Sequence, residues 1–485
     1  MRFFNKIKEK ENLPILLLFV VLINYIPLFI NNAFTKESNA VNAPIMAICF
    51  AIEIIVLFIY YFFNRNNIKK IKLNLILIFI FSTIMCIIQI KNLIKKDFMY
   101  MDLFNLECIF LNILLFYIIL YNYEIEGKKI FIFFKGIVCV AIISVLWNVI
   151  LYSSEILAII GIWIEDGLFL HGIKSFFSNR NAFAFFLYIS MISNAFLLNN
   201  DQNKKRYLFS FFIILFGIWC SHSKTGFVLS TLFLFLYMLV NSKFTVKKRL
   251  LICTIIGILG ILGILNILGI LHFNLIYETK IKQSIISLSK DSNTQSVVQQ
   301  NKTQTNTQTN TQTNTQTNVQ NNMQQEKQNN IEIDKKKYQL YKISENDLKR
   351  MSGRNDIWRV GFGILKQSPW NIIFGVGRFK STKELKFSDR EFTQFHNVYL
   401  DIALTGGIVE LVYVGYIFLS VVKKILKSNL EKNIKKIYIL AYLIYSLYIM
   451  FESCGRFSIG GVDTLCLVFF IAIPLIWSNV SKKEE

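Results

Sequence analysis

The run LPILLLFVVLINYIPLFI, residues 13–30, decides the fold class of this chain. A helix needs about 20 apolar residues to cross the hydrocarbon core of a bilayer, and this run approaches that length without a charge. It contains no A-x-A pattern of small residues for cleavage. We therefore interpret the run as a membrane-spanning helix and not as a cleavable signal.

Similar apolar runs recur along the chain, and 54% of the 485 residues are hydrophobic. A soluble protein of this size could not hide so much apolar surface. By run length we expect about twelve transmembrane helices. The predicted spans are 14–31, 44–63, 73–93, 101–122, 130–152, 181–198, 207–220, 225–241, 249–271, 397–422, 436–452 and 462–478. The sequence therefore predicts an all-α integral membrane protein.

The formal net charge of +22 comes from basic residues in short segments between the apolar runs. This placement indicates orientation in a membrane, so we expect no nucleic-acid partner. Basic clusters that fall on one side of the predicted topology begin at Arg2, Arg65, Lys204, Lys243 and Lys423. One cluster, Lys91 with Lys95 and Lys96, falls on the other side. We expect a multi-pass protein of the plasma membrane with both termini in the cytoplasm.

This topology places one large extracytoplasmic loop, residues 272–396, between the ninth and tenth predicted helices. The loop separates an N-terminal membrane bundle of about nine spans, residues 1–271, from a C-terminal bundle of three spans, residues 397–485. Residues from about 291 to 330 are nearly all Thr, Gln and Asn, a composition that cannot bury a core. We interpret this insert as a disordered tether inside the loop.

Polar clusters lie on the predicted outer side. Asn179, Arg180 and Asn181 precede the sixth span, and their side chains are suited to sugar hydroxyls or phosphate. The segment SHSKTG, residues 221–226, places a cation and hydroxyls between the seventh and eighth spans. The simple alternative for that segment is a polar turn.

The loop contains further candidates. Arg354 precedes apolar residues at helical spacing, so we expect an amphipathic helix with Arg354 at its N-terminus, where an anion is favoured. An arginine that only pairs with lipid headgroups is the alternative. The segment FGVGR, residues 374–378, predicts a tight turn next to Arg378. A lone G-x-G pattern is a weak signal.

The segment FHNVYLD, residues 395–401, lies where the loop meets the tenth span. His396 there can titrate near neutral pH and can take a proton from a hydroxyl. Asn397 and Asp401 lie one helical turn apart and are placed to order an acceptor. The alternative is a histidine that only caps or anchors the helix.

Two acids, Glu53 and Glu410, are predicted within spans. Either they are protonated and hydrogen-bonded, or they face a polar cavity.

We expect no metal and no cofactor. The eight cysteines show no C-x-x-C pattern and no metal-ligand spacing, and the chain has no Walker loop and no paired acids of the D-x-D kind. An enzyme on the outer face has no ATP, so its donor must arrive already activated. A lipid-linked diphosphate sugar meets this requirement.

Taken in order, these clusters resemble the O-antigen ligase and O-antigen polymerase superfamily over about residues 176–411. The matching motifs are Asn179-x-Asn181, Ser221-x-Ser223-Lys224, Arg354-x-x-x-Trp358, Gly375-x-Gly377, and His396-Asn397-x-Tyr399-Leu400 followed by Gly406-Gly407. The resemblance implies a polytopic glycosyltransferase that moves a glycan from an undecaprenyl diphosphate carrier without metal or nucleotide.

The resemblance also implies roles for individual residues. His396 would be the base that activates the acceptor hydroxyl, and Arg354 would bind the diphosphate and stabilise it as it leaves. Substrate-binding roles are implied for Lys224, Ser221, Ser223, Arg180, Asn179, Asn181, Asn397 and Arg378. Lys224 departs from the family, which usually has Arg there, and Lys lacks the bidentate geometry of Arg.

The sequence therefore favours a metal-independent, inverting glycosyltransferase that joins a lipid-linked oligosaccharide to an acceptor hydroxyl at the outer membrane face. A polymerase is preferred over a ligase. The alternative is a transporter or flippase for the same lipid-linked sugars. Such transporters usually contain internal repeats and a binding site at the membrane midplane, and neither is visible here.

Deleting residues 303–318, which are all Thr, Gln or Asn, should leave glycan transfer close to the level of the intact chain. The segment contains no side chain that can build a core. The check is polymer or conjugate yield in cells that contain equal amounts of membrane-inserted protein. Loss of yield at normal insertion would show that the segment takes part in activity.

Overall fold

The computed structural model describes residues 12–32, 43–64, 127–151, 173–177, 179–200, 204–241, 245–267, 354–377, 394–454 and 462–478, and the short pieces 76, 80–84, 87, 381, 386–387 and 390–391. These residues are helical apart from short connections and one small hairpin. In the hairpin, β1 (Lys386–Phe387) pairs antiparallel with β2 (Arg390–Glu391). The predicted all-helical class is therefore confirmed for the described part of the chain.

By length and composition, five of the described helical segments can cross a membrane. They are Leu13–Asn32, which contains α2 (Leu13–Ile23) and α3 (Tyr25–Asn32), and the long helices α7 (Gly127–Leu151), α9 (Arg180–Asn200), α19 (Val398–Lys427) and α20 (Lys432–Phe451). Other helices coincide with predicted spans: α4 (Ala43–Asn64), α10 (Lys204–Cys220), α11 (Lys224–Val240), α12 (Val246–Ile267), and the run α21 (Val462–Leu467), η5 (Val468–Ala472) and α22 (Ile473–Trp477). The predicted spans 73–93 and 101–122 lie largely or wholly outside the described residues, so the count of about twelve stays a prediction.

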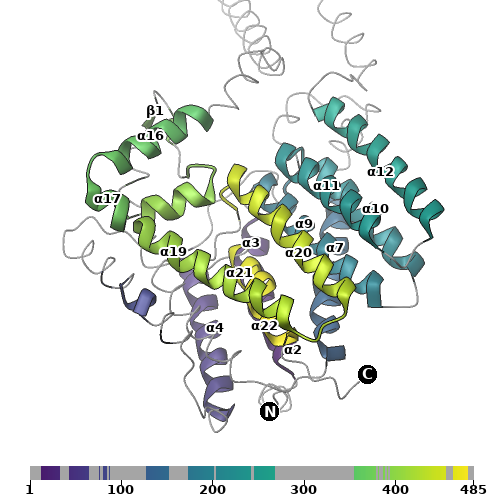
Figure 1. Ribbon diagram of the computed structural model, residues 1–485, viewed down its shortest axis with the longest axis horizontal. Helices are drawn as coiled ribbons and strands as arrows, with labels where there is room; N and C mark the ends of the chain where they lie inside the picture. Colours follow the sequence, from purple (N-terminus) through teal and green to yellow (C-terminus); the bar gives the residue numbers. More distant parts are fainter. Residues whose placement is uncertain are drawn as a thin grey trace, which may run out of the picture. The chain divides into compact units, whose positions relative to one another are not determined.

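Apart from the last three residues of α12, the described helices belong to one compact unit formed by Met1–Leu151, Gly172–Ile264 and Arg350–Glu485. Helix α9 lies at its centre, in contact with α7, α10, α11 and α20 (Figure 1). Every residue from Ala182 to Asn199 is buried. Its buried side chains include Ser190, Ser193 and Asn194, polar groups that are costly to expose to lipid. The predicted division at residues 271 and 396 stays a prediction.

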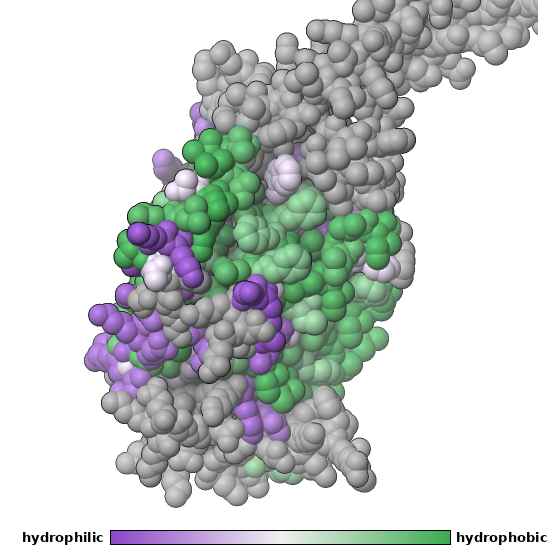
Figure 2. All heavy atoms as spheres, turned by 90° about the vertical axis from the view of Figure 1, so that its right-hand side faces the viewer, coloured by the Kyte–Doolittle hydropathy of each residue, from purple (hydrophilic) through white to green (hydrophobic). Residues whose placement is uncertain are grey.

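The outer faces of peripheral helices are apolar. Helix α12 exposes Leu250, Leu251, Ile255, Ile258 and Ile261. Apolar side chains cover much of the face seen in Figure 2. In water such a surface would promote aggregation, whereas lipid tails accept it at no cost. The described unit is therefore built to sit in a membrane.

The two acids predicted within spans differ in burial. Glu53 on α4 is buried and accepts a hydrogen bond from Asn24, which lies between α2 and α3. Of the two alternatives for Glu53, the hydrogen-bonded one fits this arrangement. Glu410 on α19 is half-buried.

Two shorter helices, α16 (Arg354–Lys366) and α17 (Pro369–Phe374), follow one another and pack on the first part of α19 (Figure 1). As predicted, a helix begins at Arg354 and ends before Pro369. Ile357 and Ile364 turn inward and form a small core with side chains that include Phe395 and Leu400. This core holds the N-terminus of α16 next to the N-terminus of α19.

A break in α19 at Gly407 anchors the end of α17. The dihedral angles of Gly407, φ 68° and ψ −159°, belong to a region that only glycine adopts readily. At the break, the N–H of Val376 donates to the carbonyl of Leu404 (2.8 Å), and the N–H of Gly377 donates to that of Thr405 (3.2 Å). The predicted glycine-rich turn therefore satisfies backbone groups that a broken membrane helix would otherwise leave open.

Gly407→Ala should destabilise the protein strongly. A Cβ on Gly407 would lie 2.2 Å from the carbonyl oxygen of Ile373. The backbone conformation alone should cost the substituted residue roughly 1–3 kcal/mol. The check is the melting temperature of the purified protein in detergent, which should fall by several degrees.

Gly415→Ala on the same helix is the matched control. Its added Cβ meets no atom within 4 Å among the described residues. Alanine favours a helix over glycine by about 0.5–1 kcal/mol, so the melting temperature should stay level or rise. Equal destabilisation by both substitutions would contradict this account of Gly407.

Candidate functional site

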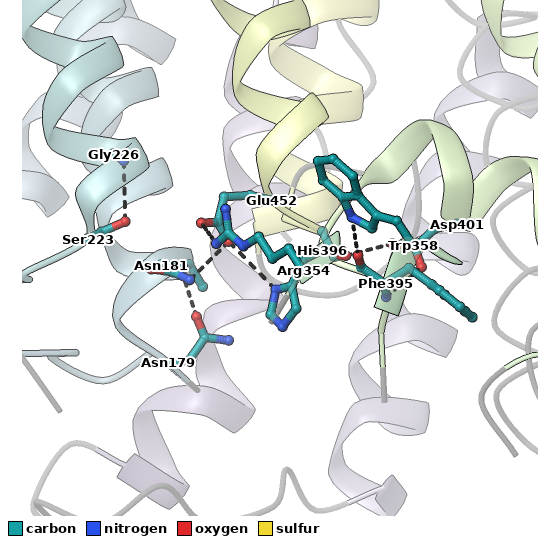
Figure 3. Close-up of polar contacts among 12 residues, drawn as sticks. Asn179, Asn181, Ser223, Gly226, Arg354, Trp358, Phe395, His396, Asp401 and Glu452 are labelled. Carbon is teal, nitrogen blue, oxygen red and sulfur yellow. Dashed lines mark hydrogen bonds and ion pairs between the residues drawn. The ribbon is translucent and has the colours of Figure 1, made fainter. Parts of the chain in front are cut away.

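A buried carboxylate, Glu452, connects segments that are far apart in the sequence. Glu452 follows the last residue of α20 and is 2% exposed. Its Oε1 accepts a hydrogen bond from Arg354 Nη2 (2.7 Å), and its Oε2 accepts one from Asn181 Nδ2 (2.9 Å). Both carboxylate oxygens are therefore engaged by side chains that the sequence identified as candidates (Figure 3).

The partners of Glu452 stand at the N-termini of helices. Arg354 is the first residue of α16, and Asn181 is the second residue of α9. Free backbone N–H groups and the helix dipole make such ends electropositive. A carboxylate is stable among them even though it is buried, because the cation of Arg354 also neutralises it. The site therefore forms around an internal anion.

His396 precedes Asn397, the capping residue of α19, and has a left-handed backbone, with φ 53°. The residues on either side hold it there. The N–H of Phe395 donates to Asp401 Oδ1 (3.2 Å), and the carbonyl of Phe395 accepts from Trp358 Nε1 (2.9 Å). The side chain of Asn397 caps α19 by accepting from the N–H of Leu400 (3.1 Å).

Asp401 also links the histidine segment to the end of α20. It is buried, and its second oxygen accepts from Ser453 Oγ at 2.6 Å. Because Ser453 follows Glu452, this bond fixes Glu452 relative to His396. Asp401 was predicted to order an acceptor, but both of its carboxylate oxygens accept hydrogen bonds within the protein, from Phe395 and Ser453.

The imidazole of His396 faces Glu452. Its Nδ1 lies 4.0 Å from Glu452 Oε2, too far for a hydrogen bond but close enough for an ion pair once the ring is protonated. Burial lowers the pKa of His396 below the ordinary imidazole value; Glu452 opposes the shift, Arg354 adds to it and Asp401 opposes it. The ring is therefore neutral at neutral pH and able to accept a proton.

The serines of the SHSKTG segment shape its turn. Ser221 Oγ donates to the carbonyl of Ile218 (2.6 Å) and accepts from the N–H of Ser223 (3.2 Å). Ser223 caps α11 by accepting from the N–H of Gly226 (3.3 Å). Both serines are buried, whereas Lys224, the first residue of α11, is exposed. Of the predicted binding residues in this turn, Lys224 is the accessible one.

The remaining predicted residues fall into different positions. The side chain of Asn179 caps α9 by accepting from the N–H of Ala182 (2.8 Å). Arg180, the first residue of α9, is half-buried. Arg378 lies outside the described residues. Among those described, no group of three or more His, Cys, Asp or Glu side chains is placed to hold a metal ion.

Glu452 was not among the residues predicted from the sequence. A signal existed, because Glu452 is the last residue of the predicted span 436–452, and an acid at that depth is costly without a partner. No regular spacing connects it to Asn181 or Arg354, which lie 271 and 98 residues away. The pairing becomes visible only when α9, α16 and α20 are packed together.

Comparison with known proteins identifies one family. A family model described as O-antigen ligase matches residues 209–415. The matched segment includes Arg354 and His396, whereas Asn181 and Glu452 lie outside it. A search of curated proteins found no match. The family match confirms the resemblance of this segment to the O-antigen ligase and polymerase superfamily and supports a membrane protein of polysaccharide biosynthesis.

Glu452→Gln should lower the pKa of His396 further. Glutamine keeps the shape of the side chain but removes the negative charge that favours the imidazolium. The check is an NMR titration of histidine-labelled protein, in which the His396 signal is assigned by its absence from a His396→Gln variant. The chain contains four histidines, which keeps the spectrum simple.

Glu431→Gln, at the opposite end of α20, is the control. Glu431 accepts hydrogen bonds from Asn199 and Asn433 and is not among the charged groups that shift His396. The pKa of His396 should not change in this variant. An unchanged pKa in Glu452→Gln as well would contradict the assigned electrostatic contact.

Proposed function

We propose that this protein is a glycosyltransferase that joins an undecaprenyl-diphosphate-linked oligosaccharide to an acceptor hydroxyl at the outer face of the plasma membrane. The acceptor is another lipid-linked repeat in a polymerase, which we prefer, or a different molecule in a ligase. The reaction is inverting and uses neither metal nor nucleotide. The family match supports the general class, and the site geometry supports the detailed assignment.

The observation that carries this proposal is the joint placement of His396 and Arg354 around Glu452. A neutral imidazole and a guanidinium, from either end of the segment 354–396, approach the same carboxylate. Transfer from a diphosphate needs a base for the incoming hydroxyl and a cation for the departing diphosphate. These two groups provide both.

In the proposed reaction, the acceptor oxygen forms a bond to the anomeric carbon of the donor sugar. The bond from that carbon to the diphosphate oxygen breaks, and the electron pair leaves with undecaprenyl diphosphate. The hydroxyl proton passes to His396. Because attack and departure take place on opposite faces in a single displacement, the anomeric configuration is inverted.

The geometry assigns different jobs to the two nitrogens of His396. Nδ1 faces Glu452, so Nε2 is the atom left for the acceptor hydroxyl. When Nε2 takes the proton, the imidazolium gains an ion pair with Glu452. As in the Ser-His-Asp triad, a carboxylate faces the ring nitrogen that does not take the proton and stabilises the imidazolium. The distance between the histidine and the carboxylate is longer here than in the triad.

Arg354 is shared between Glu452 and the donor in this proposal. Its side chain is 21% exposed while Nη2 binds Glu452, so Arg354 is not sealed inside the protein. Negative charge grows on the diphosphate as the sugar bond breaks, and a guanidinium stabilises that charge. Lys224 and Arg180 would add further cations, and Arg378 is proposed as a binding residue from sequence alone.

We further propose about twelve spans with the loop 272–396 outside and both termini in the cytoplasm. The ends of α20 support this orientation. Its N-terminal turns contain Lys432, Lys435 and Lys436, and its other end leads to Glu452. Basic ends of membrane helices are usually retained in the cytoplasm, which supports the proposed position of the site at the outer face.

His396→Ala should abolish transfer and leave binding of undecaprenyl diphosphate nearly unchanged, since a general base contributes roughly 10²–10⁴-fold. Arg354→Ala should weaken that binding and also slow transfer, and Arg354→Lys should recover only part of both. The checks are product yield and binding by purified protein. Arg359→Ala, an exposed arginine on the same helix, is the control.

The pH dependence of transfer is a second test of His396 as the base. Because His396 must be neutral to act, transfer should be flat around neutral pH and fall as pH decreases through its lowered pKa. Near-normal yield from His396→Ala at normal protein levels would remove the base assignment and leave His396 as a structural residue.

A further inference from the structure

His222 shares its local structure with His396. Its φ is 52°, also in the left-handed region, and it directly precedes Ser223, the capping residue of α11. A residue with a Cβ is uncommon in this region, although histidine adopts it more often than most. The His222 N–H donates to the carbonyl of Trp219 (3.0 Å), which holds the turn. Each histidine is therefore fixed just before the N-terminus of a helix.

The electrostatic surroundings of the two histidines differ. His396 is acted on by the carboxylates of Glu452 and Asp401 and by the cation of Arg354, whereas the charged groups that act on His222 are the cations of Arg180 and Lys224. Burial, together with Arg180 and Lys224, lowers the pKa of His222 to about 4. His222 is therefore a neutral ring in a positive environment at any ordinary pH.

Elements from several directions contribute to this environment. Arg180 begins α9 and Lys224 begins α11, so two helix N-termini add their positive potential. On the side of α10 lies Cys220, which is buried. On the side of α20, Tyr448 packs against Gly226: its OH would be 3.0 Å from a Cβ atom added there. Glu452, which follows α20, accepts hydrogen bonds from Arg354 and Asn181.

One ring nitrogen of His222 is unsatisfied. Nε2 is shielded from solvent and has no hydrogen-bond partner within the part of the chain that the structure describes. Leaving a shielded polar atom unpaired is unfavourable. A ligand with a hydrogen-bonding atom and negative charge would satisfy the nitrogen and would be attracted by the positive charges of Arg180 and Lys224 that act at His222.

We propose that His222 binds a phosphate oxygen of the lipid-linked diphosphate donor through Nε2, next to Lys224 and Arg180, and takes up a proton when the donor binds. This inference rests on the proposed function and adds a donor-binding residue to it. The proton comes from solvent on binding and returns to solvent when undecaprenyl diphosphate leaves. His396 handles the acceptor's proton, so the two histidines serve different substrates.

Proton uptake gives donor binding its own pH dependence. The bound anion raises the pKa of His222, so between the free value of about 4 and the bound value, binding is accompanied by protonation. Affinity then increases as pH falls through the bound value and weakens as pH rises. This trend is opposite to that of transfer, which needs neutral His396.

The test is the Kd of undecaprenyl diphosphate for the purified full chain in detergent, measured from mildly acidic to mildly basic pH. The intact protein should bind more weakly as pH rises. His222→Leu should raise the Kd about tenfold at acidic pH, the loss of roughly one charge-assisted hydrogen bond, and should remove the pH dependence. His222→Gln keeps an N–H donor and should recover part of the affinity without the pH dependence.

The other variants show which histidine is responsible for the pH dependence of binding. If His222→Leu fails to fold, the pH dependence in His222→Gln decides the question. A Kd and pH dependence in His222→Gln equal to those of the intact protein would overturn the role of His222. His396→Gln should keep the pH dependence of the Kd, and its loss there would assign the proton uptake to His396 instead.

Competition with phosphatidylglycerol identifies the phosphate source. Displacement of undecaprenyl diphosphate by an equal amount of phosphatidylglycerol would show a general lipid-headgroup site and overturn the donor assignment. If the intact protein bound no undecaprenyl diphosphate, the proposed function itself would fail. Normal binding and transfer with an unaffected His222→Leu variant would remove only this inference.

Discussion

The described structure depends on one buried anion, the carboxylate of Glu452. A charge removed from water at the end of a membrane helix is tolerated only if it is paired and hydrogen-bonded. Here Arg354 and Asn181 meet that requirement, and His396 lies at ion-pair distance. Because these partners come from the beginnings of α16 and α9 and from the segment before α19, one carboxylate joins these three segments to the end of α20.

The break in α19 complements this constraint. Gly407 interrupts the helix where α17 ends, and Val376 and Gly377 bind the carbonyls that the break releases. The N-terminal part of α19, with His396 before it, is thereby attached to α17 and, through the core of Ile357 and Ile364, to α16. The base and the cation of the proposed site are thus supported by the same small unit.

Much of the fold could be predicted because a bilayer allows few backbone structures. An uninterrupted apolar run long enough to cross it satisfies its own backbone hydrogen bonds as a helix. The predicted span 397–422 begins within a residue of α19, and the helix predicted to start at Arg354 is present. The pair Gly375 and Gly377 predicted a tight turn, but the contact of this turn with the break at Gly407 depends on packing that no local pattern encodes. Asn179, Asn397 and Ser223 were predicted to bind substrate, and the structure shows their side chains capping helices. Capping and ligand binding need the same chemistry, so residue type does not separate them.

The most direct test of the account is the fate of a lipid-linked oligosaccharide in proteoliposomes that contain only the purified protein. The glycan should grow or pass to an added acceptor, and undecaprenyl diphosphate should be released in proportion. Both events should disappear in His396→Ala while the protein stays inserted. A lipid-linked oligosaccharide that keeps its length and only changes leaflet would contradict the account and would identify a flippase.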